Sequence, residues 1–185
     1  MKTAAVFLDR DGTINEETGY LRSLEDLRIF PESFEAVRLI NRMGVLALVV
    51  TNQSGVARGF FDEAFVAAVH EELRNQMGHH GAVIDGFYYC PHHPTEGTGK
   101  YRITCDCRKP KPGMILQAAR DFDIDLKRSY LIGDTLRDME TAENAGVTGV
   151  LVDTGYGKEI SPADFSGDRF PTVLEAVRWI EEACR

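Results

Sequence analysis

Short apolar runs alternate with amphipathic segments along most of this 185-residue chain. The apolar runs have the length and composition of buried strands, and they cover residues 4–8, 45–50, 83–89, 130–132 and 147–152. Between them, apolar residues recur at helical spacing over residues 33–43, 62–77, 112–122, 136–145 and 173–183. The helices are predicted to begin after the N-caps Ser33, Asp62 and Thr172 and to stop at Gly44, Gly78 and Gly146. Strands that alternate with helices predict a three-layer α/β/α fold with a Rossmann-like parallel sheet.

Polar residues follow three of the predicted strands directly. Asp9 and Asp11 end the first strand, Thr51 begins a polar stretch after the second, and Asp134 follows the strand at residues 130–132. Ligands of open α/β sheets bind at the carboxyl ends of the strands. These residues are therefore predicted to meet at one edge of the sheet.

Each of these segments also fits a plain structural role when it is taken alone. Asp9 to Gly12 resembles a surface turn, because Asp and Gly are common turn formers. Residues 51–55 (Thr-Asn-Gln-Ser-Gly) could be a polar turn, and Asp134 could cap the helix that follows it. The shared position at strand ends is what favours a reaction site.

The acids in this predicted site indicate a metal ion. Asp9, Asp11 and Asp134, with Asp138 as a possible fourth, would crowd negative charge and raise one another's pKa values unless a cation is present. A set of oxygen ligands without a nearby histidine suits a hard ion, most simply Mg2+. Asp138 could instead be a solvated acid in the first turn of a helix.

The net charge of the chain is -8, which argues against non-specific binding to nucleic acid. The longest apolar run, residues 45–50, is far shorter than the ~20 residues that cross a bilayer, and no signal peptide is recognisable at the N-terminus. We expect a cytoplasmic protein of one domain, residues 1–185, with no membrane partner. Five cations between Gly99 and Gly113 could attract a small anion, and Lys109 stands among them.

Two pairs of metal-binding residues lie around the longest segment without periodicity. Cys90 and His92 form one pair and Cys105 and Cys107 the other, each with one residue between them. Together they match a closed structural zinc site of three thiolates and one imidazole, although the spacing is tighter than the common C-x2-C pattern. His93 is a rival ligand. A Cys105–Cys107 disulfide would be strained and is disfavoured in the cytosol.

A structureless stretch as long as residues 93–110 is uncommon in a compact domain, so something should tie it down. Zinc binding supplies an apparent ~10 to 16 kcal/mol in small peptides, which is enough to order such a loop. We therefore predict a zinc loop at about residues 90–108. Because Arg108 and Lys109 directly follow Cys107, the metal would also fix these two cations.

Taken in order, these motifs resemble the four motifs of the haloacid dehalogenase superfamily of phosphohydrolases. They are Asp9-x-Asp11-Gly12-Thr13, Thr51-Asn52, Lys109 and Gly133-Asp134. The resemblance implies that Asp9 is the nucleophile, that Asp11 moves the protons, and that Thr51 and Lys109 hold the phosphoryl group. It also implies that Asp9, Asp134 and the backbone carbonyl of Asp11 bind Mg2+.

The Cys-Asp-Cys-Arg-Lys-Pro run and Gly19-Tyr20 narrow the resemblance to a zinc-loop subfamily without a large cap domain. That subfamily contains the D-glycero-D-manno-heptose 1,7-bisphosphate 7-phosphatases of ADP- or GDP-heptose synthesis and, as an alternative, the histidinol-phosphate phosphatases. A metal-binding module without activity is a further alternative. By this resemblance we expect a monomer that acts on a small phosphorylated sugar, with substrate contacts from Glu17, Gly19, Tyr20, Thr51, Asn52, Gln53, Ser54, Arg108 and Lys109. Lys111, Arg58 and Arg102 are further candidates for a second phosphate.

Overall fold

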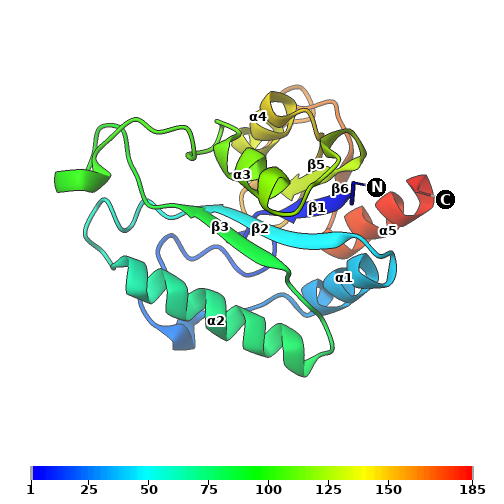
Figure 1. Ribbon diagram of the computed structural model, residues 1–185, viewed down its shortest axis with the longest axis horizontal. Helices are drawn as coiled ribbons and strands as arrows, with labels where there is room; N and C mark the ends of the chain where they lie inside the picture. Colours follow the sequence, from blue (N-terminus) through cyan, green and yellow to red (C-terminus); the bar gives the residue numbers. More distant parts are fainter. Residues whose placement is uncertain (1, 185) are drawn as a thin grey trace.

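The computed structural model describes residues 2–184, whose strands form one parallel six-stranded sheet in the order β3-β2-β1-β4-β5-β6 (Figure 1). β1 thus lies between β2 and β4, and the chain winds away from it in both directions. Such a reversal opens a crevice at the carboxyl ends of the central strands. The strands are β1 (Ala5–Leu8), β2 (Leu46–Asn52), β3 (Gly86–Cys90), β4 (Tyr130–Gly133), β5 (Thr148–Val152) and β6 (Arg169–Phe170).

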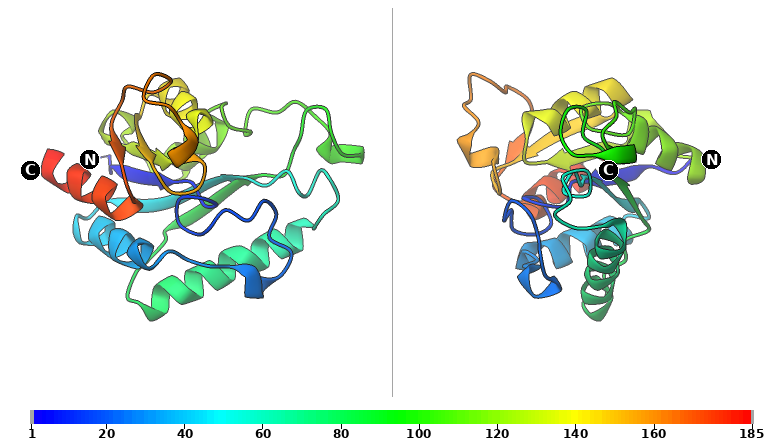
Figure 2. Two further views of the ribbon diagram at one scale, coloured as in Figure 1. Left: turned by 180° about the vertical axis from the view of Figure 1, so that it is seen from behind. Right: turned by 90° about the vertical axis from the view of Figure 1, so that its left-hand side faces the viewer.

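Helices cover both faces of this sheet (Figures 1 and 2). One face carries α1 (Pro31–Arg42), α2 (Glu63–His79) and α5 (Val173–Ala183), and the other carries α3 (Gly113–Asp121) and α4 (Leu136–Ala145). Successive residues of β1 point to opposite faces of the sheet. Val6 and Leu8 pack with the first set of helices, whereas Phe7 packs with the second. The predicted three-layer α/β/α fold is confirmed. None of the helices in residues 2–184 has the length and apolar character that a membrane crossing needs.

Two predicted helices agree with the structure at both ends. α4 begins after Thr135, whose hydroxyl accepts a hydrogen bond from Asp138 N while the Asp138 carboxylate accepts one from Thr135 N. It ends at Gly146, which has a positive φ of 74°. α5 begins after Thr172, as predicted. Thr135 is therefore the N-cap of α4, and the alternative that Asp134 caps this helix is wrong.

The predicted start of one helix and the predicted end of another are wrong. α1 begins at Pro31, so Ser33 lies inside the first turn instead of capping it. The Ser33 hydroxyl donates to the backbone oxygen of Ile14 at 2.8 Å and so ties the helix to the segment after β1. α2 is capped by Asp62 as predicted, but it continues through Gly78 because a single glycine weakens a helix without ending it.

The strand boundaries differ in a similar way. β3 begins at Gly86, and Val83 lies outside it with a side chain that is 58% exposed. β2 continues to Asn52, which pairs with Cys90 of β3. The two-residue β6 was not predicted, since it is too short to show any periodicity.

A long loop, residues 91–112, joins β3 to α3 and projects beyond the sheet (Figure 1). A short 3-10 turn at Gly99–Tyr101 is its only regular element among the described residues. The hydroxyls of Tyr89 and Tyr101 donate to the two carboxylate oxygens of Glu63 at 2.7 and 2.5 Å. This acid at the start of α2 therefore anchors both the end of β3 and the long loop.

Candidate active site

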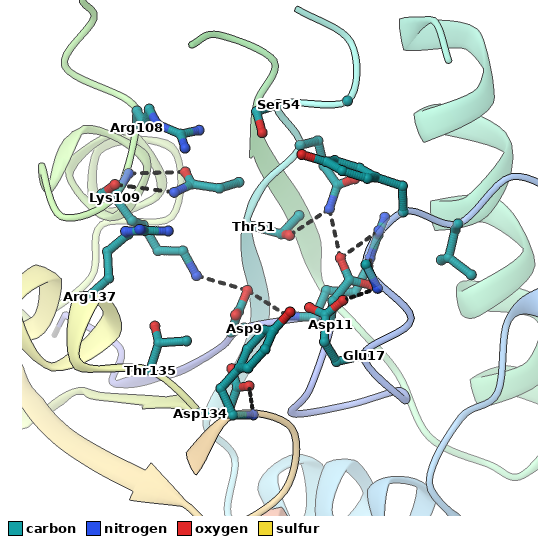
Figure 3. A pocket seen from close by; sticks show the side chains of 18 of the residues that line it. Asp9, Asp11, Glu17, Thr51, Ser54, Arg108, Lys109, Asp134, Thr135 and Arg137 are labelled. Atoms are coloured by element: carbon teal, nitrogen blue, oxygen red, sulfur yellow. Dashed lines mark hydrogen bonds and ion pairs between the residues drawn. The ribbon is translucent and has the colours of Figure 1, made fainter. Parts of the chain in front are cut away.

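The predicted site residues meet in a cleft at the carboxyl edge of the sheet (Figure 3). Asp9 follows β1, Thr51 lies near the end of β2, Asp134 follows β4, and Lys109 enters from the long loop. The cleft has a volume of about 260 Å3. Every residue predicted for catalysis, Mg2+ or substrate lines it: Asp9, Asp11, Glu17, Gly19, Tyr20, Thr51, Asn52, Gln53, Ser54, Arg108, Lys109 and Asp134.

A buried lysine joins two of the acids. Lys109 Nζ lies 2.8 Å from Asp9 Oδ1 and 2.5 Å from Asp138 Oδ1, and its side chain is 3% exposed. Burial raises the pKa of Asp9, and the positive charge of Lys109 works against that rise. Burial would lower the pKa of Lys109, but the carboxylates of Asp138 and Asp9 outweigh burial and raise it. Lys109 therefore carries a proton in this site.

Only one oxygen of Asp9 receives hydrogen bonds from the described residues. Lys109 Nζ and the backbone N of Arg10, the latter at 2.8 Å, both contact Oδ1. Oδ2 thus remains available to a phosphorus atom or a cation in the cleft.

Asp134 sits in a cradle that two glycines leave open. A Cβ atom on Gly12 or Gly155 would come within 2.2 or 2.1 Å of Asp134 Oδ2, so neither position tolerates a side chain. Oδ2 accepts a hydrogen bond from the backbone N of Tyr156 at 2.8 Å, whereas Oδ1 is buried without a partner. Burial raises the pKa of Asp134 to about 7, although the hydrogen bond from the Tyr156 backbone lowers that pKa.

This arrangement fits a hard cation. Carboxylate oxygens of Asp9, Asp134 and Asp138 lie within 4.8 Å of one another, and a buried oxygen without a partner such as Asp134 Oδ1 is costly unless something binds it. Asp138 is already engaged, because Oδ1 contacts Lys109 and Oδ2 accepts from the Thr135 hydroxyl at 2.5 Å. Asp9 and Asp134 are thus the side chains with oxygens to offer Mg2+.

The Asp11 carboxylate points away from this group of acids and is held by three side chains. Arg10 donates to both of its oxygens, from Nε at 3.1 Å and Nη2 at 2.8 Å, and Asn15 and Gln53 donate at 3.0 and 2.9 Å. Burial raises the pKa of Asp11, but the charge and hydrogen bonds of Arg10, with those of Asn15 and Gln53, bring it below its usual value. Arg10 is itself buried, and its Nη1 lies 3.4 Å from Nε2 of His70.

The two amides after Thr51 hold protein groups in place. Gln53 Nε2 donates to Thr51 Oγ1 at 2.9 Å as well as to Asp11. The Asn52 amide brackets the backbone of Lys109, accepting from its N at 3.0 Å and donating to its O at 3.2 Å. Both residues line the cleft as predicted, and they also position the side chains that the sequence assigned to catalysis.

The four predicted zinc ligands come together at the base of the long loop. Cys107 Sγ lies 3.2 Å from Cys90 Sγ, 3.3 Å from Cys105 Sγ and 3.4 Å from His92 Nδ1. With Zn–S bonds of about 2.3 Å, a tetrahedral site has S–S edges of about 3.8 Å, so these thiols stand near zinc-site spacing. The rival His93 lies elsewhere and receives hydrogen bonds from the backbone N of Glu96. The cluster is compatible with a zinc loop.

Of the four cations considered for a second phosphate, Arg108 alone lines the cleft. Lys111 pairs with Asp106 at 3.0 Å on the surface, Arg58 pairs with Glu96, and Arg102 is not among the lining residues.

The cleft also contains residues that sequence reasoning missed, among them Arg10, Phe61, Thr135, Arg137 and Tyr156. Arg137 had no sequence signal, because an arginine in the first turn of a helix resembles any solvated charge.

Two aromatic side chains, Tyr20 and Phe61, line another part of the cleft. Tyr20 packs against Phe60 and Phe61, with ring centroids 4.7 and 6.4 Å apart. Arg22 covers Phe60 at 5.4 Å from the ring centre. The backbone N of Gly19 donates to the Glu17 carboxylate at 2.5 Å, which shapes the segment before Tyr20. The segment after β1 thus forms one wall of the cleft, where Glu17, Gly19 and Tyr20 lie as predicted.

Comparisons with known proteins identify the family of this chain. The family model described as HAD-hydrolase-like matches residues 106–175. The D-glycero-beta-D-manno-heptose-1,7-bisphosphate 7-phosphatase of Vibrio cholerae serotype O1 is 45% identical over 181 residues, covering 96% of this chain and 94% of that protein. The enzyme of the same name from Escherichia coli K12 is 45% identical over 159 residues, covering 85% and 82%.

Solved structures give the same result. The D,D-heptose 1,7-bisphosphate phosphatase of B. bronchiseptica, complexed with magnesium and phosphate, superposes with a TM-score of 0.86 at 32% identity, covering 98% of this chain and 99% of that one. The corresponding protein of Burkholderia thailandensis gives a TM-score of 0.71 at 28% identity, with coverage of 97% and 99%. The chain is therefore a phosphatase, and it belongs to the heptose-1,7-bisphosphate 7-phosphatase family of the haloacid dehalogenase-like hydrolases.

Proposed function

We propose that this protein removes the 7-phosphate of D-glycero-D-manno-heptose 1,7-bisphosphate through an aspartyl phosphate formed on Asp9. The observation that carries the proposal is the meeting of Asp9, Thr51, Lys109 and Asp134 in one cleft. The close similarity to relatives that bear the name of this activity supports the choice of substrate.

In the first step, Asp9 Oδ2 attacks phosphorus, and the bond between phosphorus and the sugar oxygen breaks. Lys109 and Arg10 N hold Oδ1 of the same carboxylate, so the attacking oxygen is oriented in advance. The leaving oxygen takes a proton from Asp11, which must take up that proton when substrate binds, because Arg10, Asn15 and Gln53 keep its carboxylate ionised in the free protein. In the second step Asp11 accepts a proton from water, which attacks phosphorus, releases phosphate and restores the Asp9 carboxylate.

Charge and position account for most of the expected rate. Lys109 Nζ and the Thr51 hydroxyl face the cleft and would hold oxygens of the transferring phosphoryl group. Asp9, Asp134 and the backbone oxygen of Asp11 would hold Mg2+. When bound, this ion supplies positive charge that neutralises the phosphoryl oxygens and the crowded acids.

We assign zinc a structural role at Cys90, His92, Cys105 and Cys107. A full set of four ligands leaves no open position for substrate. Because Arg108 Nη1 donates to the His92 backbone oxygen at 3.1 Å, the cluster also fixes the start of the segment that carries Lys109. We propose that residues 1–185 act as one domain, with the zinc loop at about residues 90–108.

Steady-state phosphate release from heptose 1,7-bisphosphate and from histidinol phosphate, compared side by side, tests the proposal. The expected result is a kcat/KM at least about a hundredfold higher for the bisphosphate, because two charged contacts are added. A preference for histidinol phosphate would assign the alternative activity. Absence of turnover on any phosphomonoester in the presence of Mg2+ would favour a binding module.

A further inference from the structure

Two arginines meet on one wall of the cleft, next to Lys109 (Figure 3). Arg108 lies at the end of the long loop, and Arg137 lies in the first turn of α4. Both line the cleft and also the hollow that adjoins it under the long loop.

Neither guanidinium has an acidic partner among residues 2–184. Arg108 donates to the backbone oxygen of His92, and the exposed side chain of Arg137 makes no hydrogen bond or ion pair with any residue that the structure describes. By contrast, Arg58 pairs with Glu96. In a chain with a net charge of -8, two adjacent cations without an acid indicate a site for an external anion.

The position of Arg137 adds to this positive potential. The first turn of a helix presents free N–H groups, so it favours anions and disfavours cations. An arginine there opposes the stability of α4, whereas Asp138 one residue later follows the usual preference. Helix stability therefore does not explain Arg137. The helix terminus, Arg108 and Arg137 instead reinforce one another as an anion site.

We propose that Arg137, together with Arg108, binds the second phosphate of the substrate, the one that is not hydrolysed. The inference rests on the proposed function and deepens it, because it makes Arg137 a specificity-determining residue that selects bisphosphates over monophosphates. Guanidinium groups suit this task because their paired N–H donors match two phosphate oxygens. Lys109 does not compete for this phosphate, since its ammonium group faces Asp9 and Asp138.

The test compares wild type, Arg137→Gln and the control Arg120→Gln, which removes an exposed arginine from α3, away from the cleft. Heptose 1,7-bisphosphate and heptose 7-phosphate compete with p-nitrophenyl phosphate in the Mg2+-loaded enzyme, which gives an apparent constant for each sugar whether or not it is hydrolysed. In Arg137→Gln, the constant for the bisphosphate should rise about tenfold or more, the loss typical of a charged hydrogen bond. The constant for the 7-phosphate should change less than about twofold, and Arg120→Gln should alter neither.

Equal changes for the two sugars in Arg137→Gln would overturn the inference, because Arg137 would then act on the shared phosphate or on the fold. No change for either sugar would overturn it as well. Phosphate release from the bisphosphate by wild type is recorded separately. Failure of that release would count against the proposed function, while the competition constants would still decide whether Arg137 recognises a second phosphate.

Discussion

Replacing Lys109 by methionine should destabilise the metal-free protein far more than the same change at Lys111, two residues along. Methionine keeps most of the aliphatic length of lysine but removes the ammonium group. Lys109 is 3% exposed and contacts Asp9 at 2.8 Å and Asp138 at 2.5 Å. Without it, two buried carboxylates face each other and Asp134 with no positive charge among them.

The size of the effect follows from burial. Removing one partner of a buried ion pair costs about 3 to 5 kcal/mol, because the other charge remains buried and unpaired. For a protein of this length, that loss corresponds to a fall in Tm of about 6 to 20 °C. The Lys111–Asp106 pair has side chains that are 46% and 94% exposed. Such a surface pair contributes about 0 to 1 kcal/mol.

Urea unfolding and thermal melts in Mg2+-free buffer with zinc retained, followed by circular dichroism, measure both variants. Adding Mg2+ should restore part of the stability of Lys109→Met, since the ion supplies the missing positive charge to the same acids. It should have no special effect on Lys111→Met relative to wild type. If the two variants lost equal stability, the Lys109 network would not be the buried ion pair described above. If Mg2+ left the Lys109→Met deficit unchanged, the acids would not form its site.

Two further predictions concern the metals. Because burial raises the pKa of Asp134 from 3.8 to about 7, its contribution to the stability of the metal-free protein is present below about pH 4 and is lost as pH rises through 7. Mg2+ must displace that proton, so its affinity should weaken about tenfold for each decrease of one pH unit below 7, and titrations showing constant affinity from pH 5 to 7 would contradict this. Metal analysis should find about one zinc per chain in wild type and Cys184→Ser but none in the double variant Cys105→Ser/Cys107→Ser; full occupancy there would refute the ligand set.

The sequence predicted which side chains meet at the carboxyl edge of the sheet, because their placement there depends on local signals. Apolar runs end where polar residues begin, and parallel strands bring such ends together wherever the sheet order places them side by side. Asp9 and Asp134 follow strands that are direct neighbours in the sheet. The clustering of the two metal-binding pairs could also be predicted from the sequence, since residues two apart on an extended chain point to the same side.

The contacts that orient these groups could not be read from the sequence. The sequence assigned no role to Arg10 between the two aspartates. Arg10 is nevertheless buried, and two of its nitrogens donate hydrogen bonds to the Asp11 carboxylate. Asn52 reaches the backbone of Lys109 across 57 positions of the chain. Both contacts depend on how distant side chains meet in three dimensions, and no spacing rule encodes them.

The errors in the predicted starts of α1 and β3 also come from contacts between distant residues. Ser33 is a good N-cap residue by type, but Pro31 already fits the first turn, and the Ser33 hydroxyl has a tertiary partner in Ile14. Val83 has high strand propensity, yet it lies outside the sheet, where its backbone contacts the Asn41 side chain. In both cases a tertiary contact outweighs local preference.

The most direct test of the central assignment is 31P NMR of heptose 1,7-bisphosphate incubated with Mg2+ and either wild type or Asp9→Asn. Wild type should remove the phosphate signal at C7 and leave the anomeric phosphate at C1 intact, while Asp9→Asn, folded by circular dichroism, should leave both signals unchanged. Loss of the C1 phosphate, or turnover by Asp9→Asn at a rate near that of wild type, would contradict the assignment of Asp9 as the nucleophile of a 7-phosphatase.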